Sequence, residues 1–392
     1  MTLAGRRKLA ARILLGLGCC AAALLLLELP ALFRVVDYRN IIGANPLHSN
    51  YMDDPELVFI HRPNSRLTGS APCGFAARVY DIPLAEQTAY HWDVRYDRNG
   101  FRNATDLTSA ETVALGDSCV EATPVPDAQL MTTLLANSGG KAVANLGHNG
   151  YGPQQELAVL RRYGLPLRPR TVIWVFSEGT DIGDAQQYGR LTRRESNFWL
   201  AFLDRCFTKN ALERLRIAGK QPAAQGRGVL HNANGMSNTY FTFADVFSAE
   251  PLPKTMFPGL DETVRSLRAA ANLCADRGCR AILVYAPDKY RVFHDFCTFP
   301  PEFQWRNRPL NDLPKRMAGI VESMAPEMGY LDLTPALMDD VRSGGMPYSI
   351  DDGHWNEEGE RIAAKALDGY LSTHASGWSA ASNRPSRPGP LP

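Results

Sequence analysis

Short apolar runs alternate with helix-like patterns along the chain from residue 112 onward. Five apolar runs have the length and composition of buried strands, at 112–115, 142–147, 171–179, 280–287 and 329–334. Between or after them, apolar residues recur at helical spacing in 127–137, 153–164, 262–278, 313–324 and 356–371. This alternation predicts an α/β fold with a mostly parallel sheet that helices cover on both faces.

The N-terminal segment, residues 1–36, has the pattern of a membrane anchor. The basic run RRK at 6–8 and Arg12 precede a long apolar stretch. The stretch extends to Phe33 with one acidic residue, Glu28, and is long enough to cross a hydrocarbon core. A cleaved signal peptide is the alternative, but no small-residue cleavage site follows the apolar run at once. Because basic residues precede the span, we expect a cytoplasmic N-terminus and, in a bacterium, a single-pass inner-membrane protein with a periplasmic domain.

The rest of the chain divides into three parts. Residues 37–110 alternate strand-like pieces with turn residues and predict a small β-rich extension. Residues 111–374 carry the strand and helix alternation, interrupted by an insertion at 182–256 with Gly, Asn and aromatic clusters. The polar, Pro-rich tail at 375–392 predicts disorder.

Charge argues against one class of partner. The 392-residue chain has 42 Lys and Arg against 41 Asp and Glu, so no basic surplus predicts nucleic-acid binding. Six of the eight cysteines follow the anchor, in a compartment that permits disulfides. Cys274 and Cys279 are either a disulfide or two buried thiols, because spacing alone does not fix the pairing.

Polar residues follow the predicted strands at the edge where a parallel sheet binds its ligands. Ser118 follows the first strand in GDSC and can offer both its hydroxyl and its backbone N–H. Gly150, in a Gly-rich loop after the second strand, can supply a further N–H. A serine nucleophile also needs a base and an orienting acid. His354 in DDGHWN fits the base, with Asp352 or Asp351 as the acid.

Four blocks of this sequence resemble the SGNH, or GDSL-like, hydrolase superfamily. GDS, the glycine of NLGHNGYG, EGTD and DGHWNEEG stand in the order of the superfamily's blocks, and the resemblance extends from 112 to 372. The DGHWN form resembles a membrane-anchored branch with alginate-type O-acetyltransferase and acetylesterase domains. The resemblance implies a three-layer α/β/α sandwich with a five-stranded, mostly parallel sheet. It also implies ester hydrolysis or acyl transfer that requires no metal and no cofactor.

The resemblance further implies roles for single residues. Ser118 would be the nucleophile and the first oxyanion donor, and Gly150 the second donor. His354 would be the general base. Asp352 is the preferred orienting acid because the DGHW form has its acid two residues before the histidine, while Asp351 fits the spacing of the wider superfamily and stays open.

One block departs from the superfamily pattern. Thr180 stands where the superfamily has an asparagine as third oxyanion donor, and loss of one such donor typically costs about a hundredfold to a thousandfold in rate. Two functions therefore stay open. The first is a membrane-anchored, exported serine esterase or acyltransferase that acts on acyl groups, expected to be O-acetyl, of a glycan or another ester. The alternative is a catalytically weakened protein that binds a glycan or a polysaccharide-assembly partner.

Overall fold

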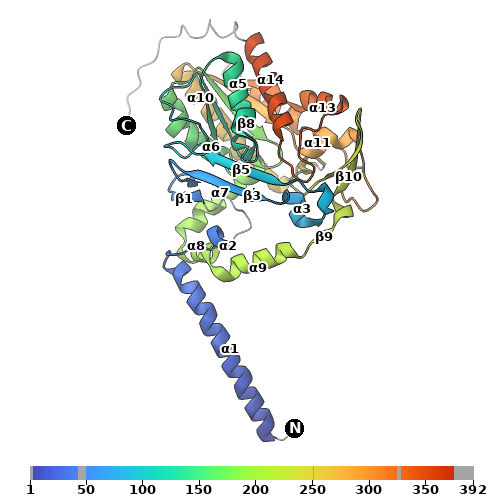
Figure 1. Ribbon diagram of the computed structural model, residues 1–392. Coiled ribbons are helices and arrows are strands. Elements are labelled where there is room, and N and C mark those ends of the chain that lie inside the picture. Colours follow the sequence, from blue (N-terminus) through green and yellow to red (C-terminus); the bar gives the residue numbers. More distant parts are fainter. Residues whose placement is uncertain (1–2, 43–49, 250, 325–327, 375–392) are drawn as a thin grey trace. The chain divides into compact units, whose positions relative to one another are not determined.

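The computed structural model of the chain is shown in Figure 1, and it describes residues 3–42, 50–249, 251–324 and 328–374. The expected disordered tail, 375–392, lies outside the described residues. The chain forms two compact units, which we describe separately. The anchor unit comprises Met1–Tyr51 and Leu191–Gly219, and the sheet unit comprises Met52–Arg190 and Lys220–Pro392. The domain boundaries expected from the sequence stay predictions.

A five-stranded parallel sheet forms the centre of the sheet unit. Its strand order is β14-β12-β8-β6-β7, and every neighbouring pair is parallel. The strands are β6 (Thr112–Gly116), β7 (Val143–Gly147), β8 (Thr171–Ser177), β12 (Arg280–Ala286) and β14 (Met328–Asp332). Each coincides with one of the five apolar runs, so the expected α/β class and the five-stranded sheet are confirmed.

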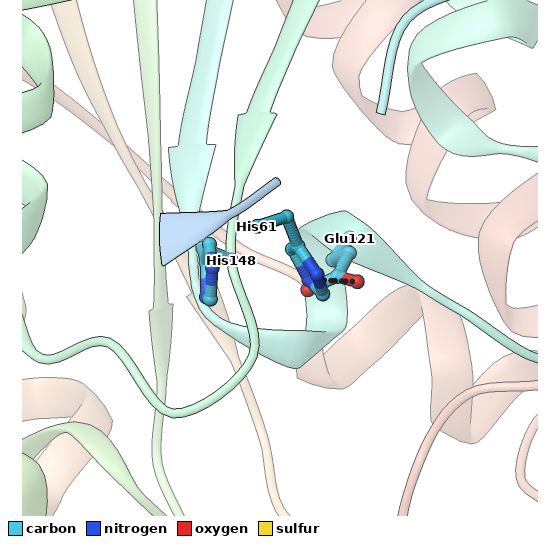
Figure 2. A group of neighbouring side chains, drawn as sticks. All are labelled: His61, Glu121 and His148. Carbon is cyan, nitrogen blue, oxygen red and sulfur yellow. Dashed lines mark hydrogen bonds and ion pairs between the residues drawn. The ribbon is translucent and has the colours of Figure 1, made fainter. Parts of the chain in front are cut away.

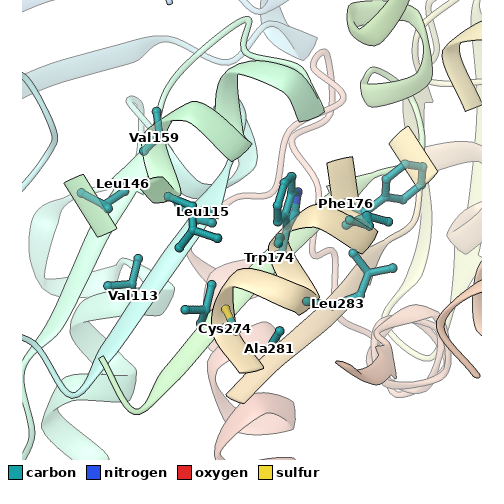
Figure 3. Close-up of a cluster of buried hydrophobic side chains, with 14 of the residues drawn as sticks. Val113, Leu115, Leu146, Val159, Trp174, Phe176, Cys274, Ala281 and Leu283 are labelled. Atoms are coloured by element: carbon teal, nitrogen blue, oxygen red, sulfur yellow. The ribbon is translucent and has the colours of Figure 1, made fainter. Parts of the chain in front are cut away.

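Side chains alternate between the two faces of this sheet. Along β8, Val172 and Trp174 contribute to one buried cluster, whereas Ile173 and Val175 contribute to the other. Figure 3 shows the first cluster, in which strand side chains meet residues from the covering helices. That face is covered by α6 (Pro153–Val159), α10 (Phe257–Arg277) and α12 (Leu313–Glu322). The opposite face is covered by α5 (Met131–Gly139), α13 (Thr334–Arg342) and α14 (Glu357–Thr373), which completes three layers.

Local signals explain where the helices nearest the site begin and end. The Asn356 side chain accepts hydrogen bonds from the backbone N–H groups of Glu358 and Gly359 and so caps the start of α14. Helix α10 ends at Gly278, which adopts the left-handed conformation typical of a helix C-terminus. The shorter helices of the sheet unit are α3 (Phe75–Val79), α4 (Ser118–Glu121) and α11 (Lys289–Phe293). Helix α7 (Asp181–Ser196) begins in the sheet unit and ends in the anchor unit.

Short strands surround the main sheet. Strands β3 (Arg66–Ala71) and β5 (Tyr90–Arg95) are antiparallel, and β1 (Tyr51–Asp54) lies beside β2 (Val58–His61). The two-residue strands β4 (Tyr80–Asp81) and β9 (Gln221–Pro222) form a parallel pair. A third group has the order β11-β10-β13 and consists of β10 (Arg227–Asn232), β11 (Gly235–Tyr240) and β13 (Cys297–Thr298).

The anchor unit contains the candidate membrane span. Helix α1 (Leu3–Leu32), blue in Figure 1, includes an apolar segment from Arg12 to Leu32, whose most apolar stretch has a mean hydropathy of 2.2 and no buried residue. By length and composition this segment is able to cross a membrane. The other helices of the unit are α2 (Arg39–Ile42), α8 (Phe198–Arg205) and α9 (Phe207–Ala218).

All eight cysteines of the chain are free thiols in this structure. Cys274 and Cys279 are both buried, and the Cys279 N–H donates to the Cys274 carbonyl at 2.9 Å. Of the two alternatives for this pair, the structure therefore records two neighbouring buried thiols.

Candidate active site

A sharp turn between β6 and α4 presents Ser118. Gly116 ends the strand with φ +155°, and a Cβ atom there would lie 2.6 Å from a methyl carbon of Val120. Only glycine fits this turn without a clash. The Asp117 side chain then caps α4 by accepting the Cys119 N–H at 2.9 Å. Ser118 is therefore the first residue of a helix that begins directly beyond the carboxyl end of a central strand.

Ser118, His354 and Asp352 form one hydrogen-bonded line. The Ser118 Oγ lies 2.8 Å from the His354 Nε2, and the His354 Nδ1 lies 2.5 Å from the Asp352 Oδ1. The Asp352 carboxylate also accepts the backbone N–H of Phe75 at 2.9 Å and that of His354 at 3.0 Å. This is the order of contacts that a serine nucleophile, a general base and an orienting carboxylate require.

Asp351 makes different contacts. Its carboxylate is fully buried and accepts the backbone N–H of Gly74 at 2.8 Å and of Thr88 at 3.2 Å. The Tyr90 hydroxyl donates to it at 3.2 Å. The geometry thus pairs His354 with Asp352, while Asp351 holds a segment from the expected β-rich extension against the loop that carries the histidine.

The ion pair changes the acidity of both partners. Partial removal from water alone would lower the pKa of His354, but the charge of Asp352 and its hydrogen bond raise that pKa to about 9. Burial opposes ionisation of Asp352 as well, yet the histidine and two backbone N–H groups hold the pKa of the carboxyl below its ordinary value. The His354 side chain is 46% exposed, so both substrate and water can reach the imidazole.

The backbone N–H groups of Ser118 and Gly150 stay the predicted oxyanion donors. Gly150 lies in the loop after β7 with φ +78°, a conformation that favours glycine. Among the hydrogen bonds of the described residues, none uses the backbone N–H of Ser118 or of Gly150. Both donors belong to segments that follow neighbouring strands of the central sheet, β6 and β7.

Thr180 has a partner of its own. Its hydroxyl donates to the Asp117 Oδ2 at 2.7 Å. A threonine hydroxyl carries a single proton, so in this arrangement that proton supports the cap of α4. A place for Thr180 in an oxyanion hole stays a prediction.

A buried cluster beside the nucleophile helix was not predicted from the sequence. Figure 2 shows His61 and Glu121 in contact, with the ring of His148 alongside. The Glu121 carboxylate lies 3.0 Å from the His61 Nε2 and accepts the Asn149 N–H at 2.6 Å. The Tyr96 hydroxyl also donates to it, at 2.7 Å. This network joins the end of α4 to the loop that carries Gly150, and its members are too distant in sequence to form a recognisable motif.

The same three side chains are of types that bind metals. Their ligand atoms lie within 4.8 Å of one another, which raises the question of a metal site. The described contacts already use these atoms within the protein, since the His61 Nε2 lies 3.0 Å from the Glu121 carboxylate and the His148 Nδ1 lies 3.0 Å from the Asn149 carbonyl. Burial and the neighbouring His61 lower the pKa of His148 to about 3. We therefore describe the cluster as a hydrogen-bond network with a neutral His148.

A buried lysine holds the loop that carries the histidine. The Lys289 ammonium shares its three protons among four backbone carbonyls, those of Tyr240, Ser349, Ile350 and Asp352, at distances of 2.6 to 3.1 Å. Burial lowers the pKa of Lys289 to about 8, although nearby carboxylates oppose the shift. The sequence does not reveal this role of Lys289, because its acceptors are backbone atoms that leave no signature.

Comparisons with known proteins identify related folds at low similarity. No protein-family profile matches the chain, and no curated protein does. One similar solved structure is a putative lipolytic protein of the G-D-S-L family from Desulfitobacterium hafniense, with 14% identity and TM-score 0.36, covering 66% of this chain and 98% of that one. Another is a catalytic mutant of an acetylxylan esterase from Geobacillus stearothermophilus, with 13% identity and TM-score 0.35, covering 70% of this chain and 97% of that one.

A third similar structure is a carbohydrate esterase whose active site is described as having divergent catalytic and non-catalytic binding functions. It has 10% identity and TM-score 0.36, and the match covers 81% of this chain and 86% of that one. Because these TM-scores and identities are low, the functional assignment below depends on the side chains of this chain.

Replacing the two adjacent aspartates separately tests their roles. Asp352→Asn removes the carboxylate that holds His354, and we expect kcat on an acyl ester to fall by about 10⁴-fold with little change in Tm. Asp351→Asn leaves three donors without a charged acceptor, and we expect the free energy of unfolding to fall by about 1–3 kcal/mol, with a much smaller loss of kcat. Steady-state kinetics and denaturant unfolding of both variants measure this, and equal effects would contradict the assignment.

The raised pKa of His354 predicts a pH profile. The imidazole must be neutral to accept the Ser118 proton, so kcat/KM should increase as the pH rises through about 9. Asp352→Asn removes the main cause of the raised pKa of His354. The midpoint of the pH profile for the residual activity should therefore shift from about 9 toward 6.5. Initial rates across the pH range of both proteins provide the measurement. A midpoint that does not move in the variant would show that Asp352 does not control the histidine.

Three substitutions at Thr180 separate its possible roles. Thr180→Ser keeps the hydroxyl bond to Asp117 and should retain kcat, whereas Thr180→Val removes it and should lower kcat. Thr180→Asn offers two amide protons, one for Asp117 and one for an oxyanion. We expect that variant to raise kcat more than it changes KM, by up to about a hundredfold. If the asparagine variant loses as much activity as the valine variant, a missing third donor does not limit the rate.

Proposed function

We propose that this protein is a serine esterase or acyltransferase of the SGNH type, anchored in a membrane and acting on acyl groups of a glycan in the exported compartment. The observation that carries the proposal is the line of contacts from the Ser118 Oγ through His354 to Asp352. The backbone N–H groups of Ser118 and Gly150, the expected oxyanion donors, have no acceptor among the described residues, which supports the proposal.

The chemistry follows from these positions. The Ser118 Oγ attacks the ester carbonyl carbon while the His354 Nε2 takes its proton, and Asp352 stabilises the resulting imidazolium. The negative charge on the carbonyl oxygen is stabilised by the N–H groups of Ser118 and Gly150. Collapse of the tetrahedral intermediate breaks the bond to the alcohol, which leaves with the proton from His354. The acyl-enzyme is then attacked by water in hydrolysis or by a sugar hydroxyl in transfer, with His354 again as base.

The substrate class and the location rest on sequence features. The DGHWN block around His354 is similar to domains that add or remove O-acetyl groups on exported polysaccharides, so an O-acetylated glycan is the first substrate to test. The apolar segment Arg12–Leu32 supports a single membrane span. Basic residues before that span favour an exported sheet unit.

One observation favours the second candidate, a glycan-binding protein without turnover. The Thr180 hydroxyl is bonded to Asp117, so a third side-chain donor to the oxyanion is missing in this arrangement. A protein with the same fold and a weak oxyanion hole would bind an acylated glycan and release it unchanged.

Covalent labelling distinguishes the two candidates. The full-length protein in detergent is treated with a fluorophosphonate probe and assayed on an acetyl ester, alongside Ser118→Ala and the exposed control Ser138→Ala. We expect labelling and ester hydrolysis in the wild type and in Ser138→Ala, and neither in Ser118→Ala. Labelling that persists in Ser118→Ala, or a wild type that neither reacts with the probe nor hydrolyses any acyl ester, would overturn the enzymatic assignment.

A further inference from the structure

Helices α8 and α9 of the anchor unit expose large apolar side chains. These are Phe198, Trp199, Leu203, Leu212 and Leu215. Trp199 is 65% exposed and Leu215 is 69% exposed. Large apolar side chains gathered on two consecutive helices indicate a surface that something covers.

The exposed side chains lie on one side of each helix. In α8, Trp199 and Leu203 are about 40° apart around the helix axis at 100° per residue and are exposed, whereas Ala201 and Arg205 lie across the axis from them and are buried. Phe198 lies at the edge of the exposed side. In α9, Leu212 and Leu215 are three residues apart and share a face. Each helix therefore uses one side within the protein and leaves an apolar side outward.

A carboxylate of the candidate membrane span holds the start of α9. The Glu28 side chain accepts the backbone N–H of Phe207 at 2.8 Å and that of Thr208 at 2.7 Å. It lies one helical turn before the end of α1 at Leu32, which corresponds to about 6 Å along the axis at 1.5 Å per residue. The first turn of α9 is thus held at the depth where α1 reaches its end.

The segment that follows α1 holds the junction of the two helices. The Tyr38 N–H donates to the Arg205 carbonyl at 3.1 Å, and the Tyr38 ring meets the Phe207 ring edge to face at 5.4 Å. Asp37 lies 3.7 Å from the Arg205 Nε. Together with the Glu28 contact, these interactions hold the junction of α8 and α9 beside the end of α1.

Composition indicates the kind of surface that covers these helices. Residues 191–219 contain six Lys and Arg against three Asp and Glu. On α9, Lys209 and Arg216 border one edge of the apolar side by helical spacing, and Lys209 also pairs with Asp204 at 2.6 Å. An apolar side with a tryptophan and flanking basic residues is typical of a helix that lies in the interface of a bilayer.

We infer that α8 and α9 lie on the phospholipid bilayer, with Trp199, Leu203, Leu212 and Leu215 among the acyl chains and the flanking basic residues at anionic headgroups. This inference rests on the membrane insertion of α1 given in the proposed function and is independent of the chemistry at Ser118. The insertion in the chain at 191–219 thereby adds a second membrane contact to the single span.

Quenching of Trp199 by lipid tests the inference. The full-length protein is reconstituted into phosphatidylcholine and phosphatidylglycerol vesicles whose acyl chains are brominated near the headgroup, and tryptophan emission is compared with that in unbrominated vesicles. None of the six tryptophans lies in α1, so the span itself gives no signal. We expect brominated lipid to quench the wild-type emission and Trp199→Phe to lose that quenching. Trp305→Phe, the matched control in the sheet unit, should keep it.

Flotation of the same samples separates the two proposals. If the protein floats with the vesicles and Trp199→Phe is quenched as strongly as the wild type, or neither is quenched, the inference about α8 and α9 is wrong while the anchor stands. If the protein does not float, the anchor itself is wrong and the inference fails with it. Protein that floats and loses the quenching only in Trp199→Phe supports both.

Discussion

The Lys289 ammonium is the interaction on which the candidate active site most depends. A buried cation is costly unless hydrogen bonds and charges compensate it, and here it donates to carbonyls of Ser349, Ile350 and Asp352 as well as to Tyr240. These bonds fix the backbone of the loop, and the contacts of Asp351 with Gly74 and Thr88 hold the loop from another side. With the backbone fixed, the Asp352 carboxylate can orient His354 at little entropic cost during the reaction.

A second buried network holds the other side of the nucleophile. Glu121, at the end of α4, accepts the Asn149 N–H and thereby positions the loop that carries Gly150, a predicted oxyanion donor. The loop that carries His354 and the loop that carries Gly150 are thus fixed by separate groups, a cation among carbonyls and a carboxylate among donors. Both networks are charged and buried, which makes them intolerant of loss of one member. The rigidity of the site comes from these contacts beyond the three residues that would react.

Sequence analysis was most successful where the signal is periodic or local. All five central strands follow from apolar runs, and Ser118 and His354 follow from their places after such runs. Asp352 is preferred over Asp351 only through the resemblance, because adjacent residues of one type differ only in the direction of their side chains, which the sequence does not show. The cluster around Glu121 joins positions 61, 121 and 148, a contact that no local pattern encodes. Thr180 shows a further limit, since the direction of a hydroxyl proton depends on the neighbouring Asp117.

Glu28 changes the interpretation of the anchor. As a sequence feature it is a single charge near the end of an apolar stretch, and a deletion of residues 1–36 would remove only a span. In the structure the Glu28 carboxylate accepts hydrogen bonds from the backbone N–H groups of Phe207 and Thr208 and from the Thr208 hydroxyl. A carboxylate near a membrane needs such donors to compensate for the loss of water. The same deletion would leave that first turn without its cap. The span and the 191–219 segment are therefore one folding unit, and the natural form for functional work is the full-length protein in a membrane or detergent.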